Sequence, residues 1–380
     1  MIKMTNKKLK VGNVPNLRFP GFEGEWESKK LSEIAEIGRG KSKHRPRDAE
    51  FLFGGKYPFV QTGDIRKADL FLTQFTQTYS EAGLMQSKLW NENTLCITIA
   101  ANIAETAILK IKACFPDSII GLIPKKNETT VLFVKHLFDK FKIEIQRLSQ
   151  GVAQDNLNQE KLSKIEFSFP KLVEQDKVTS FLSSIDERIA TQNKIIEQLQ
   201  TLIKGLCQEI ILSQTPNRKL KDCVSCYSSS LTELDVIGEK GTYPVYGATG
   251  IITFISKYQI NEDAILIIKD GSGVGKVHYA TDKFSVTGTL NYLIVKPAIS
   301  LKYIFYCLKF FNFKKYKVGS SIPHIYFKDY GKSFIYCPSF DEQQKIEMLL
   351  SSIDEKINIE SILLKKYEMQ KKHLLQNLFI

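Results

Sequence analysis

The sequence contains no uninterrupted run of about 18 apolar residues, the length that a membrane-spanning helix needs. Its basic opening, residues 1–13, lacks the apolar core of a secretory signal, so we expect no export. The seven cysteines are odd in number and mostly isolated, and they form no disulfide framework. These absences argue against membrane-spanning and disulfide-rich secreted proteins and favour the reduced cytoplasm.

Motifs for catalysis or metal binding are also missing. There is no NPP[FY] tetrapeptide of the kind found in adenine methyltransferases, no HExxH, and no nuclease-like carboxylate cluster followed by ExK. The stretch DGSGVGKV resembles a phosphate loop, but a Walker loop needs Gly in place of Asp270 and Ser or Thr in place of Val277. Cys223 and Cys226 form a lone CxxC, whereas structural zinc needs four ligands. We therefore expect no catalytic, metal or cofactor site in this chain.

What the sequence does contain is one stretch that occurs twice. Pro170–Ile189 reads PKLVEQDKVTSFLSSIDERI, and Pro338–Ile357 reads PSFDEQQKIEMLLSSIDEKI. The two copies align without a gap at a constant offset of 168 residues (338 − 170), and eleven of the twenty pairs are identical. A match of this length indicates an internal duplication.

After each copy, apolar residues recur at alternating spacings of four and three, the heptad pattern of a coiled coil. The sequence Ser-x-x-Glu at Ser184 and at Ser352 fits a capping box, so each helix is expected to begin there and run for about 27 residues. Polar Gln192, Glu360 and Lys371 interrupt the pattern and would fix the register. Two unrelated core helices are the alternative, but the repeat favours two helices packed antiparallel on each other: Ile185–Ile210 and Ile353–Leu378.

The chain is basic, with 53 Lys and Arg against 41 Asp and Glu and a net charge of +12. An excess of this size suggests a polyanionic partner, nucleic acid first and a membrane surface second. Charge alone is weak support, because many soluble proteins from A/T-rich genomes are rich in lysine. The assignment of a partner therefore depends on where the basic and polar residues gather.

Two globular α/β units alternate with the two helices. The first is expected to have strands near residues 30–37, 57–61, 94–99 and 107–111 and a covering helix over 131–148. The pair Tyr243-Pro244 in the second unit resembles Tyr57-Pro58, but its offset is 186 rather than 168, so the first unit carries about 18 extra residues after this strand. We divide the chain into an N-terminal extended segment, a first domain, a central helical region, a second domain and a C-terminal helical region: residues 1–25, 26–169, 170–213, 214–337 and 338–380.

This layout resembles a known family. Two diverged domains that alternate with two P-x3-EQ-x-K-x4-L-x2-IDE-x-I helices look like the specificity subunit of a Type I restriction–modification system. The opening VPNLRFPGFEGEW also resembles the start of many such subunits. The likeness covers essentially the whole chain, although in the globular parts it extends only to the plan.

The resemblance implies an α+β fold in which two α/β target recognition domains alternate with two long conserved helices that form an antiparallel coiled coil with a pseudo-two-fold axis. It implies that each domain reads one half of a split, asymmetric site in double-stranded DNA. It also implies that the helices dock two methyltransferase subunits and, through them, restriction subunits. S-adenosylmethionine, and ATP with Mg²⁺ for restriction, would then belong to these partners and not to this chain.

Polar and basic loops stand at the same place in both units and suit contacts with base edges and phosphates. In the first unit, the DNA-binding candidates are Lys41, Lys43, His44, Arg45, Gln61, Thr62, Asp64, Asn102, Gln154 and Asn156. In the second unit, they are Tyr246, Thr249, Lys269, Ser272, Lys276, Ser320, Ser321 and His324. The repeated motif occurs twice, so its exposed face is expected to bind two copies of one partner through Glu174, Gln175, Glu342 and Gln343.

Two classes of function remain open at this point. The first is a sequence-reading subunit without catalysis that scaffolds enzymes. The second is a stand-alone DNA-modifying enzyme with an unrecognised active site. The missing methyltransferase and nuclease motifs favour the first, and the charge of +12 argues against a coiled-coil adaptor with no role at DNA.

Overall fold

The chain folds into two compact units. The first comprises Met1–Asn193 together with Ile362–Ile380, and the second comprises Lys194–Ser361. The computed structural model describes the following residues: 2–3, 12–100, 102–149 and 157–380. Among these residues, no helix is long and apolar enough to cross a membrane.

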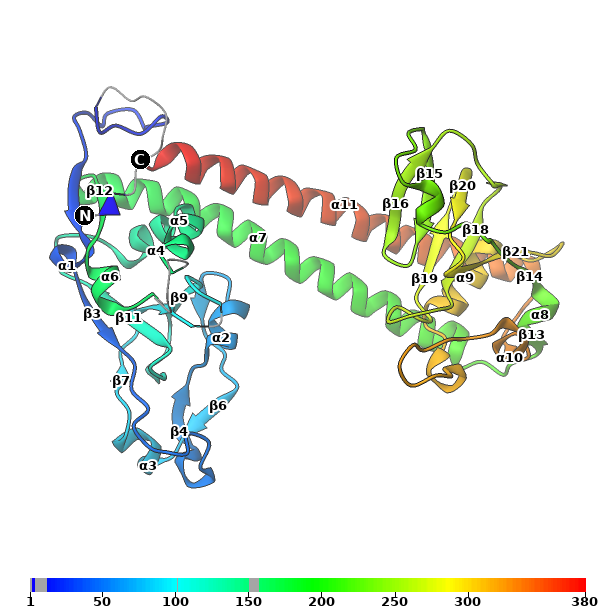
Figure 1. The fold of residues 1–380 in the computed structure, drawn as a ribbon, viewed down its shortest axis with the longest axis horizontal. Helices are drawn as coiled ribbons and strands as arrows, with labels where there is room; N and C mark the ends of the chain where they lie inside the picture. The colour runs from blue at the N-terminus through cyan, green and yellow to red at the C-terminus, as the bar shows by residue number, and fades with distance from the viewer. Residues whose placement is uncertain (1, 4–11, 101, 150–156) are drawn as a thin grey trace. The chain divides into compact units, whose positions relative to one another are not determined.

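The central sheet of the first unit has the strand order β3-β11-β8-β9-β5 (Figure 1). Neighbouring strands are antiparallel except β5 and β9, which run parallel. Alternate residues of the inner strands enter two different apolar clusters, so both faces of this sheet are buried. The strands are β3 (Ala35–Arg39), β5 (Phe71–Leu72), β8 (Leu95–Thr98), β9 (Thr106–Leu109) and β11 (Ile119–Pro124).

A second sheet of the first unit has the order β6-β4-β10-β7, and a third has the order β1-β12-β2. Their strands are β1 (Ile2–Lys3), β2 (Glu27–Lys30), β4 (Phe53–Phe59), β6 (Gln77–Tyr79), β7 (Leu89–Trp90), β10 (Ala113–Cys114) and β12 (Ile165–Phe169). Short helices connect them: α1 (Leu31–Ile34), η1 (Glu50–Leu52), α2 (Thr62–Lys67), α3 (Glu81–Met85) and α6 (Gln159–Ser163).

Two expectations for the first unit need correction. The strand expected over 30–37 is interrupted by α1, because Leu31 and Ile34 lie on one side of a helical turn and both are buried. The covering helix is present but divided into α4 (Val131–Lys140) and α5 (Lys142–Arg147), which meet at buried Phe141. The hydroxyl of Thr130 caps α4 by accepting from the Phe133 amide at 3.2 Å.

The second unit repeats this plan with the sheets β14-β21-β18-β19, β16-β15-β20-β17 and β13-β22. Its strands are β13 (Arg218–Lys219), β14 (Val224–Ser228), β15 (Tyr243–Gly247), β16 (Gly250–Ile255), β17 (Ile260–Asn261), β18 (Ala264–Ile268), β19 (Val277–Ala280), β20 (Lys283–Val286), β21 (Leu290–Val295) and β22 (Phe334–Ile335). Its short helices are α8 (Leu220–Cys223), η3 (Leu234–Val236), α9 (Leu301–Lys309), η4 (Phe313–Tyr316) and α10 (Phe327–Tyr330).

The duplication inferred for the globular units is confirmed strand by strand. The order β3-β11-β8-β9 corresponds to β14-β21-β18-β19, and β6-β4-β10-β7 corresponds to β16-β15-β20-β17. Covering helix α9 corresponds to α4 and is capped in the same way, by Ser300. Residues 60–76 separate β4 from β6, whereas residues 248–249 join β15 to β16, so the extra segment lies where the offset placed it and holds α2 and β5.

The two long helices are α7 (Leu172–Cys207), which continues through a π-helical turn η2 (Gln208–Leu212), and α11 (Phe340–Leu378). They have 36 and 39 residues and begin well before Ser184 and Ser352, so the predicted capping boxes and the length of about 27 residues were wrong. The hydroxyl of Ser184 donates to the Ser180 carbonyl at 3.0 Å, and that of Ser352 donates to the Leu349 carbonyl at 2.8 Å. These serines therefore bond back to their own helix as interior residues do.

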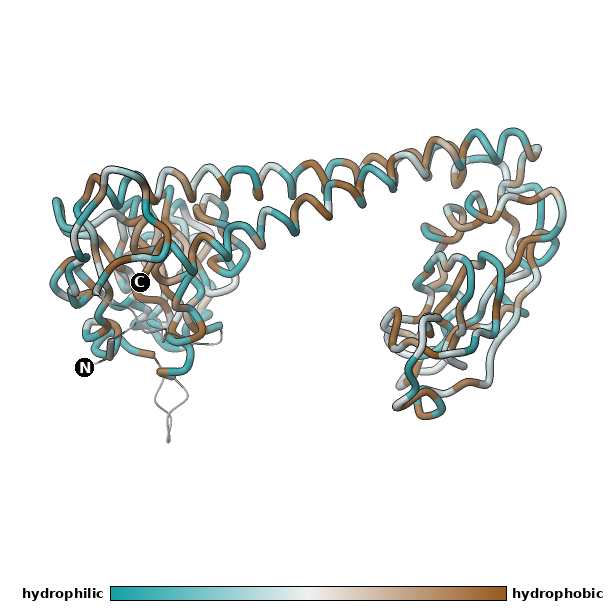
Figure 2. Tube along the Cα trace, turned by 90° about the horizontal axis from the view of Figure 1, so that it is seen from above, coloured by the Kyte–Doolittle hydropathy of each residue, from teal (hydrophilic) through white to brown (hydrophobic). Residues whose placement is uncertain are grey.

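Within each unit the two helices share one apolar core. In the first unit, Leu182 and Ile185 of α7 are buried in the cluster that holds Leu374 and Leu378 of α11. In the second unit, Ile203 of α7 lies in the same cluster as Leu350, Ile353 and Ile357 of α11. Each unit thus combines one end of α7 with the opposite end of α11, the arrangement of an antiparallel pair, and Figure 2 shows apolar residues recurring along both helices.

Candidate nucleic-acid interface

The basic loop after β3 is held in place by its backbone, and its cationic side chains are exposed. The Lys41 amide donates to the Phe115 carbonyl at 3.2 Å, and the His44 amide donates to Gln86 Oε1 at 2.9 Å. The side chains of Lys41, Lys43 and Arg45 remain exposed. The ring of His44 packs edge-on against Phe51 with the ring centroids 5.0 Å apart. A loop held in this way presents its cations in a defined place, which suits phosphate contact.

A cavity of about 670 Å³ joins this loop to the start of α2. Gln61 and Thr62 line it, as do Ser42 and Arg47 of the basic loop. Gln77 also lines it, and its Oε1 accepts from the side-chain Nε2 of Gln61. The structure therefore brings together two segments that the sequence patterns had marked separately. It also adds Arg47, which stands in the same basic run and could have been chosen from it, and Gln77, for which no sequence pattern provides a signal.

Other candidates of the first unit behave differently. Asp64 is buried, and its carboxylate accepts from the Gln61 amide at 2.9 Å and from Thr76 Oγ1 at 3.3 Å. It caps α2, so its expected place in a DNA-facing loop is corrected. Asn102 is half-buried outside the cavity and accepts from Arg66 Nη1 at 3.4 Å. Gln154 and Asn156 lie outside the described residues.

In the second unit, two separate candidate loops form one surface. The backbone of the loop after β18 pairs with residues 323–325, since the Gly271 amide donates to the Pro323 carbonyl and the Ile325 amide donates to the Lys269 carbonyl, both at 3.0 Å. His324 Nδ1 lies 2.5 Å from Asp270 Oδ1, and these side chains are 37% and 31% exposed. Lys269 and His324 are thus neighbours, and Asp270, which the sequence marked only as part of the stretch DGSGVGKV, joins the candidates.

The remaining candidates of the second unit surround this pair. Ser272, Lys276, Ser320 and Ser321 are exposed or half-exposed. Thr249 is exposed in the turn between β15 and β16. This turn lies close to Gly273, since a side chain at position 273 would place its Cβ 3.8 Å from the Ala248 carbonyl oxygen. Tyr246 is half-buried, with its ring edge-on to Phe284 at 5.7 Å, so only part of it is available for contact.

The glycine-rich stretch after β18 forms the hairpin turn to antiparallel β19, which begins at Val277. A phosphate loop needs a helix N-terminus directly after the glycines, and here a strand follows instead. Among the residues that the structure describes, no three His, Cys, Asp or Glu side chains gather as a metal site.

The repeated motif fixes each domain to the helices instead of facing outward. Gln175 is fully buried, and its Oε1 accepts from Thr129 Oγ1 at 2.8 Å and from the Thr130 amide at 3.3 Å. Gln343 is 1% exposed, and its Oε1 accepts from the Ser300 amide at 2.9 Å. Both glutamines therefore bind the N-cap region of a covering helix, once in each unit.

The glutamates of the motif differ from each other. Glu174 is 3% exposed and forms an ion pair with Arg18 at 2.7 Å, and it also accepts from Trp26 Nε1 at 3.3 Å. Glu342 is exposed and accepts from the Tyr336 hydroxyl at 3.1 Å. The expectation that all four motif residues form an exposed partner-binding face is therefore wrong for Glu174, Gln175 and Gln343, which are engaged inside the chain.

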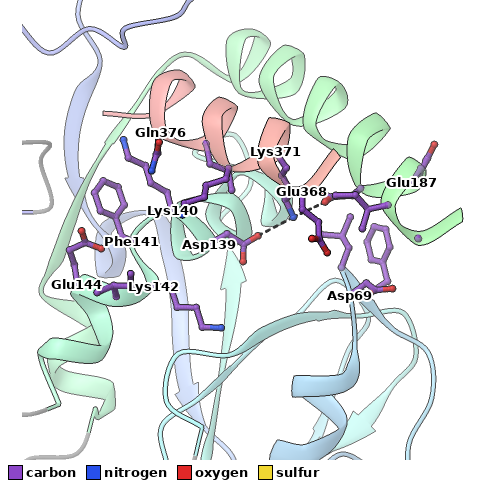
Figure 3. Close-up of a pocket in the computed structure, with 18 of the residues that line it drawn as sticks. Asp69, Asp139, Lys140, Phe141, Lys142, Glu144, Glu187, Glu368, Lys371 and Gln376 are labelled. Atoms are coloured by element: carbon purple, nitrogen blue, oxygen red, sulfur yellow. Dashed lines mark ion pairs between the residues drawn. The ribbon is translucent and has the colours of Figure 1, made fainter. Parts of the chain in front are cut away.

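The aspartate of the motif makes a second joint. In the first unit, Lys371 Nζ of α11 lies 2.6 Å from Asp186 Oδ1 of α7 and 3.8 Å from Asp139 Oδ2 of α4 (Figure 3). These residues line a pocket of about 1100 Å³ between the domain and the helices. In the second unit, the equivalent Asp354 lies 3.0 Å from Lys309 of covering helix α9.

These charges hold one another in their ionised forms. Burial by itself would raise the pKa of Asp139, but the neighbouring Lys135, His136 and Lys371 outweigh it, and the pKa lies well below its ordinary value. Burial would likewise lower the pKa of Lys371, yet Asp139 and Asp186 raise it above its ordinary value. Lys371, which interrupts the heptad pattern, thus marks the point where α4, α7 and α11 meet.

The comparison with protein families agrees with this geometry. The model described as "Type I restriction modification DNA specificity domain" matches residues 23–201 and 217–368. The chain belongs to the family of Type I restriction–modification specificity subunits. The two matches cover both domains and most of both long helices, in keeping with the duplication.

Curated relatives that align with this specificity subunit over most of their length are also named as specificity subunits. The Type I restriction enzyme MjaIX specificity subunit of Methanocaldococcus jannaschii is 22% identical over 403 residues, covering 92% of this chain and 90% of the relative. The EcoprrI specificity subunit of Escherichia coli is 21% identical, covering 89% of each. These relatives are named as specificity subunits, which are recognition components without catalysis, and the chain is accordingly a specificity subunit and not an enzyme.

Solved structures share the fold. The S subunit of a Type I restriction–modification system from M. genitalium superposes with a TM-score of 0.68 at 18% identity, covering 97% of this chain and 99% of that one. A chain from a study of complex assembly and conformational transition of the type I R-M system gives a TM-score of 0.53 at 13% identity, covering 95% and 98%.

Proposed function

We propose that this specificity subunit reads a bipartite, asymmetric site in double-stranded DNA, one half through each globular unit. The observation that supports this most directly is the repeated strand order, which gives two homologous domains whose candidate loops differ in sequence. In the first unit the loop around Lys41 and Arg45 would contact phosphate, while Gln61 and Gln77 of the adjoining cavity would contact base edges. In the second unit Lys276 would contact phosphate, while His324 and Ser272 would discriminate bases.

We further propose that the helices dock two methyltransferase subunits and, through them, restriction subunits in the cytoplasm. The methyltransferases would use S-adenosylmethionine to methylate adenine N6, and ATP with Mg²⁺ would act on the restriction subunits. No residue of this chain is assigned to these cofactors. Exposed Glu342 and the outward faces of α7 and α11 are the surfaces available for such docking.

Mapping of methylated adenines across the genome of cells with and without this chain tests the proposal. We expect a split motif of two short conserved halves to lose its methylation when the chain is absent. The purified chain alone should neither methylate nor cut DNA. Activity of the isolated chain would instead support a stand-alone enzyme, and an unsplit motif would contradict reading by two domains.

The stoichiometry is tested separately by native mass measurement of the complex with the methyltransferase in excess. Two partner copies per specificity subunit are expected, because the helical motif and the domain fold both occur twice in the chain. A complex that stays at one copy would contradict equivalent docking.

A further inference from the structure

Two thiols meet where the chain enters and leaves the second domain. Cys223 ends α8, just after entry, and Cys337 follows β22, directly before Pro338 and α11. Their Sγ atoms are 3.9 Å apart. Cys223 is fully buried, whereas Cys337 keeps 8% of its surface exposed. Of the two residues, only Cys337 has any exposed surface.

The surroundings of Cys337 hold it in place and favour its thiolate. Asn217 brackets its backbone, since the Cys337 amide donates to Asn217 Oδ1 at 2.8 Å and Asn217 Nδ2 donates to the Cys337 carbonyl at 3.1 Å. The Gln343 amide group donates to Cys337 Sγ at 3.5 Å. The Cys223 thiol and the Arg218 guanidinium both lower the pKa of Cys337 below its ordinary value, because each stabilises negative charge on sulfur.

The fold itself does not require sulfur at these two positions. In the first unit, the residue that ends α1, as Cys223 ends α8, is Ile34. The residue at the constant offset from Cys337 is Phe169 (337 − 168). Both are buried apolar side chains in the corresponding joint. The thiol pair is therefore an addition in the second unit to a joint that can be built from hydrocarbon.

We propose that Cys337 and Cys223 form an oxidisable dithiol, with Cys337 as the attacking thiolate and Cys223 as the resolving thiol. With a peroxide such as H₂O₂, the Cys337 thiolate attacks one oxygen, the O–O bond breaks, and sulfenic acid and hydroxide form. The hydroxide takes up the proton that the Cys337 thiol had released and becomes water. The Cys223 sulfur then attacks the sulfenic sulfur, and the displaced hydroxyl leaves with the Cys223 thiol proton as a second water. Two thiols and one peroxide thus give one disulfide and two waters.

The disulfide would join the entry of the second domain to its exit. The strands β13 and β22 already pair there, with Arg218 opposite Ile335 and Lys219 opposite Phe334. A covalent bond across the same neck would prevent these two segments from separating. The first domain, with Ile34 and Phe169 at its neck, would be unaffected, so oxidation would act on one of the two domains only.

The test is mass spectrometry of the full chain after brief exposure to H₂O₂ and blocking of the remaining thiols. We expect loss of two of the seven thiols and a single cross-linked peptide pair containing Cys223 and Cys337, reversed by dithiothreitol. Without oxidant, limiting maleimide should label Cys337 at least about tenfold faster than buried Cys96. Retention of both thiols while added glutathione is consumed would overturn the proposal, as would preferential oxidation of another cysteine.

Two variants separate the roles of the thiols. Cys223→Ala should leave Cys337 reactive but without a resolving thiol, so that its sulfenic acid is trapped by dimedone and no cross-link appears. Cys96→Ala, in the core of the first unit, should still form the cross-link. Dimedone labelling that is no greater in Cys223→Ala than in the wild type would exclude Cys223 as the resolving thiol. Should either variant fail to fold, the peptide mapping of the wild type still decides.

Discussion

At the scale of single residues, Gln175 and Gln343 show why the motif is repeated. A buried amide group has two donors and an acceptor with two lone pairs, and Gln175 uses both ends: Oε1 binds Thr129 and Thr130, while Nε2 donates to the Pro170 carbonyl at 2.9 Å. Gln343 makes the same donation to Pro338 at 2.9 Å. The side chain therefore ties the start of a long helix to the cap of a covering helix.

Replacing Gln175 by Leu should lower the free energy of unfolding of the first unit by roughly 3 kcal/mol, because the buried partners lose their hydrogen bonds. Both tryptophans, Trp26 and Trp90, lie in the first unit, so tryptophan fluorescence during urea denaturation reports on that unit. Gln343→Leu should leave the urea midpoint of the fluorescence transition nearly unchanged. It should lower the urea midpoint of the transition followed by circular dichroism, which reports on both units. Gln198→Leu, on an exposed position of α7, is the control. Equal shifts of the fluorescence midpoint for Gln175→Leu and Gln198→Leu would refute the proposed role of Gln175 in joining the domain to the helix.

The basic loop makes a separate prediction. Replacing Lys41, Lys43 and Arg45 together by Ala should weaken binding to all DNA sequences alike, since phosphates carry no sequence information. The slope of log affinity against log salt should flatten by about 0.9 for each phosphate that is no longer neutralised. Fluorescence anisotropy over a salt series measures both. A charge-matched control replaces three exposed lysines on or directly beside α7: Lys171, Lys194 and Lys204. Unchanged affinity at low salt would place the loop away from DNA.

At the scale of elements, the ion-pair network decides how α4, α7 and α11 meet. Lys371 interrupts the heptad pattern of α11 and pairs with a carboxylate on each of the other two helices. Exchanging such buried partners for well-packed apolar residues costs little, but removing one partner leaves a charge stranded. The network therefore specifies one arrangement of these helices more than it adds stability.

Asp139→Asn should destabilise the first unit by about 3 kcal/mol at neutral pH, because buried Lys135 loses its counter-charge and Lys371 keeps only Asp186. The pKa of Asp139 is depressed in the folded chain, so its contribution is complete above the unfolded pKa of about 3.9 and is lost as pH falls further. The difference in free energy of unfolding between wild type and variant should therefore become smaller below about pH 4. Denaturation followed by tryptophan fluorescence at several pH values measures this, with exposed Asp176→Asn as the control. A difference that is constant down to about pH 2 would contradict the assignment.

At the scale of the whole molecule, duplication makes the two domains separable. Each has its own sheets, its own core clusters and its own joint to the helices. Exchanging Lys219–Pro338 for the equivalent segment of another specificity subunit keeps the anchoring Gln343 on α11. The exchange should change one half of the methylated sequence and leave the other half the same, as read by sequencing of methylated sites. A change in both halves would mean that the domains do not read independently.

The exposed linker after α7 provides a second test at this scale. Residues 212–218 are exposed, whereas Ile211 is buried in the core of the second unit. Inserting residues between Ile211 and Arg218 should lengthen the unread gap of the target while both halves keep their bases. The same methylation map measures the outcome. A change in base identity at constant spacing would refute the hypothesis that the helices set the distance between the two halves of the target.

The plan of the molecule could be predicted from the local patterns of the chain. A constant offset, matched heptads and paired Tyr-Pro strands predicted the two related domains, the two helices and the position of the extra segment, because periodicity and repetition are local properties of the chain. The sequence also singled out both halves of each candidate surface, such as Lys41 with Gln61 and Lys269 with His324.

Which polar residues face solvent could not be predicted in this way and depends on the folded chain. Ser184 reads as a helix cap, Gln175 as an exposed contact and Asp64 as a reader of DNA, yet the first bonds back to its own helix and the other two are buried. Ser184 bonds to Ser180 and Asp64 bonds to Gln61, both nearby in the chain. Gln175 bonds to Thr129, which lies 46 residues away. A polar side chain has the same local signature whether water or a distant backbone group satisfies it, and only the folded chain brings that distant group within hydrogen-bonding distance.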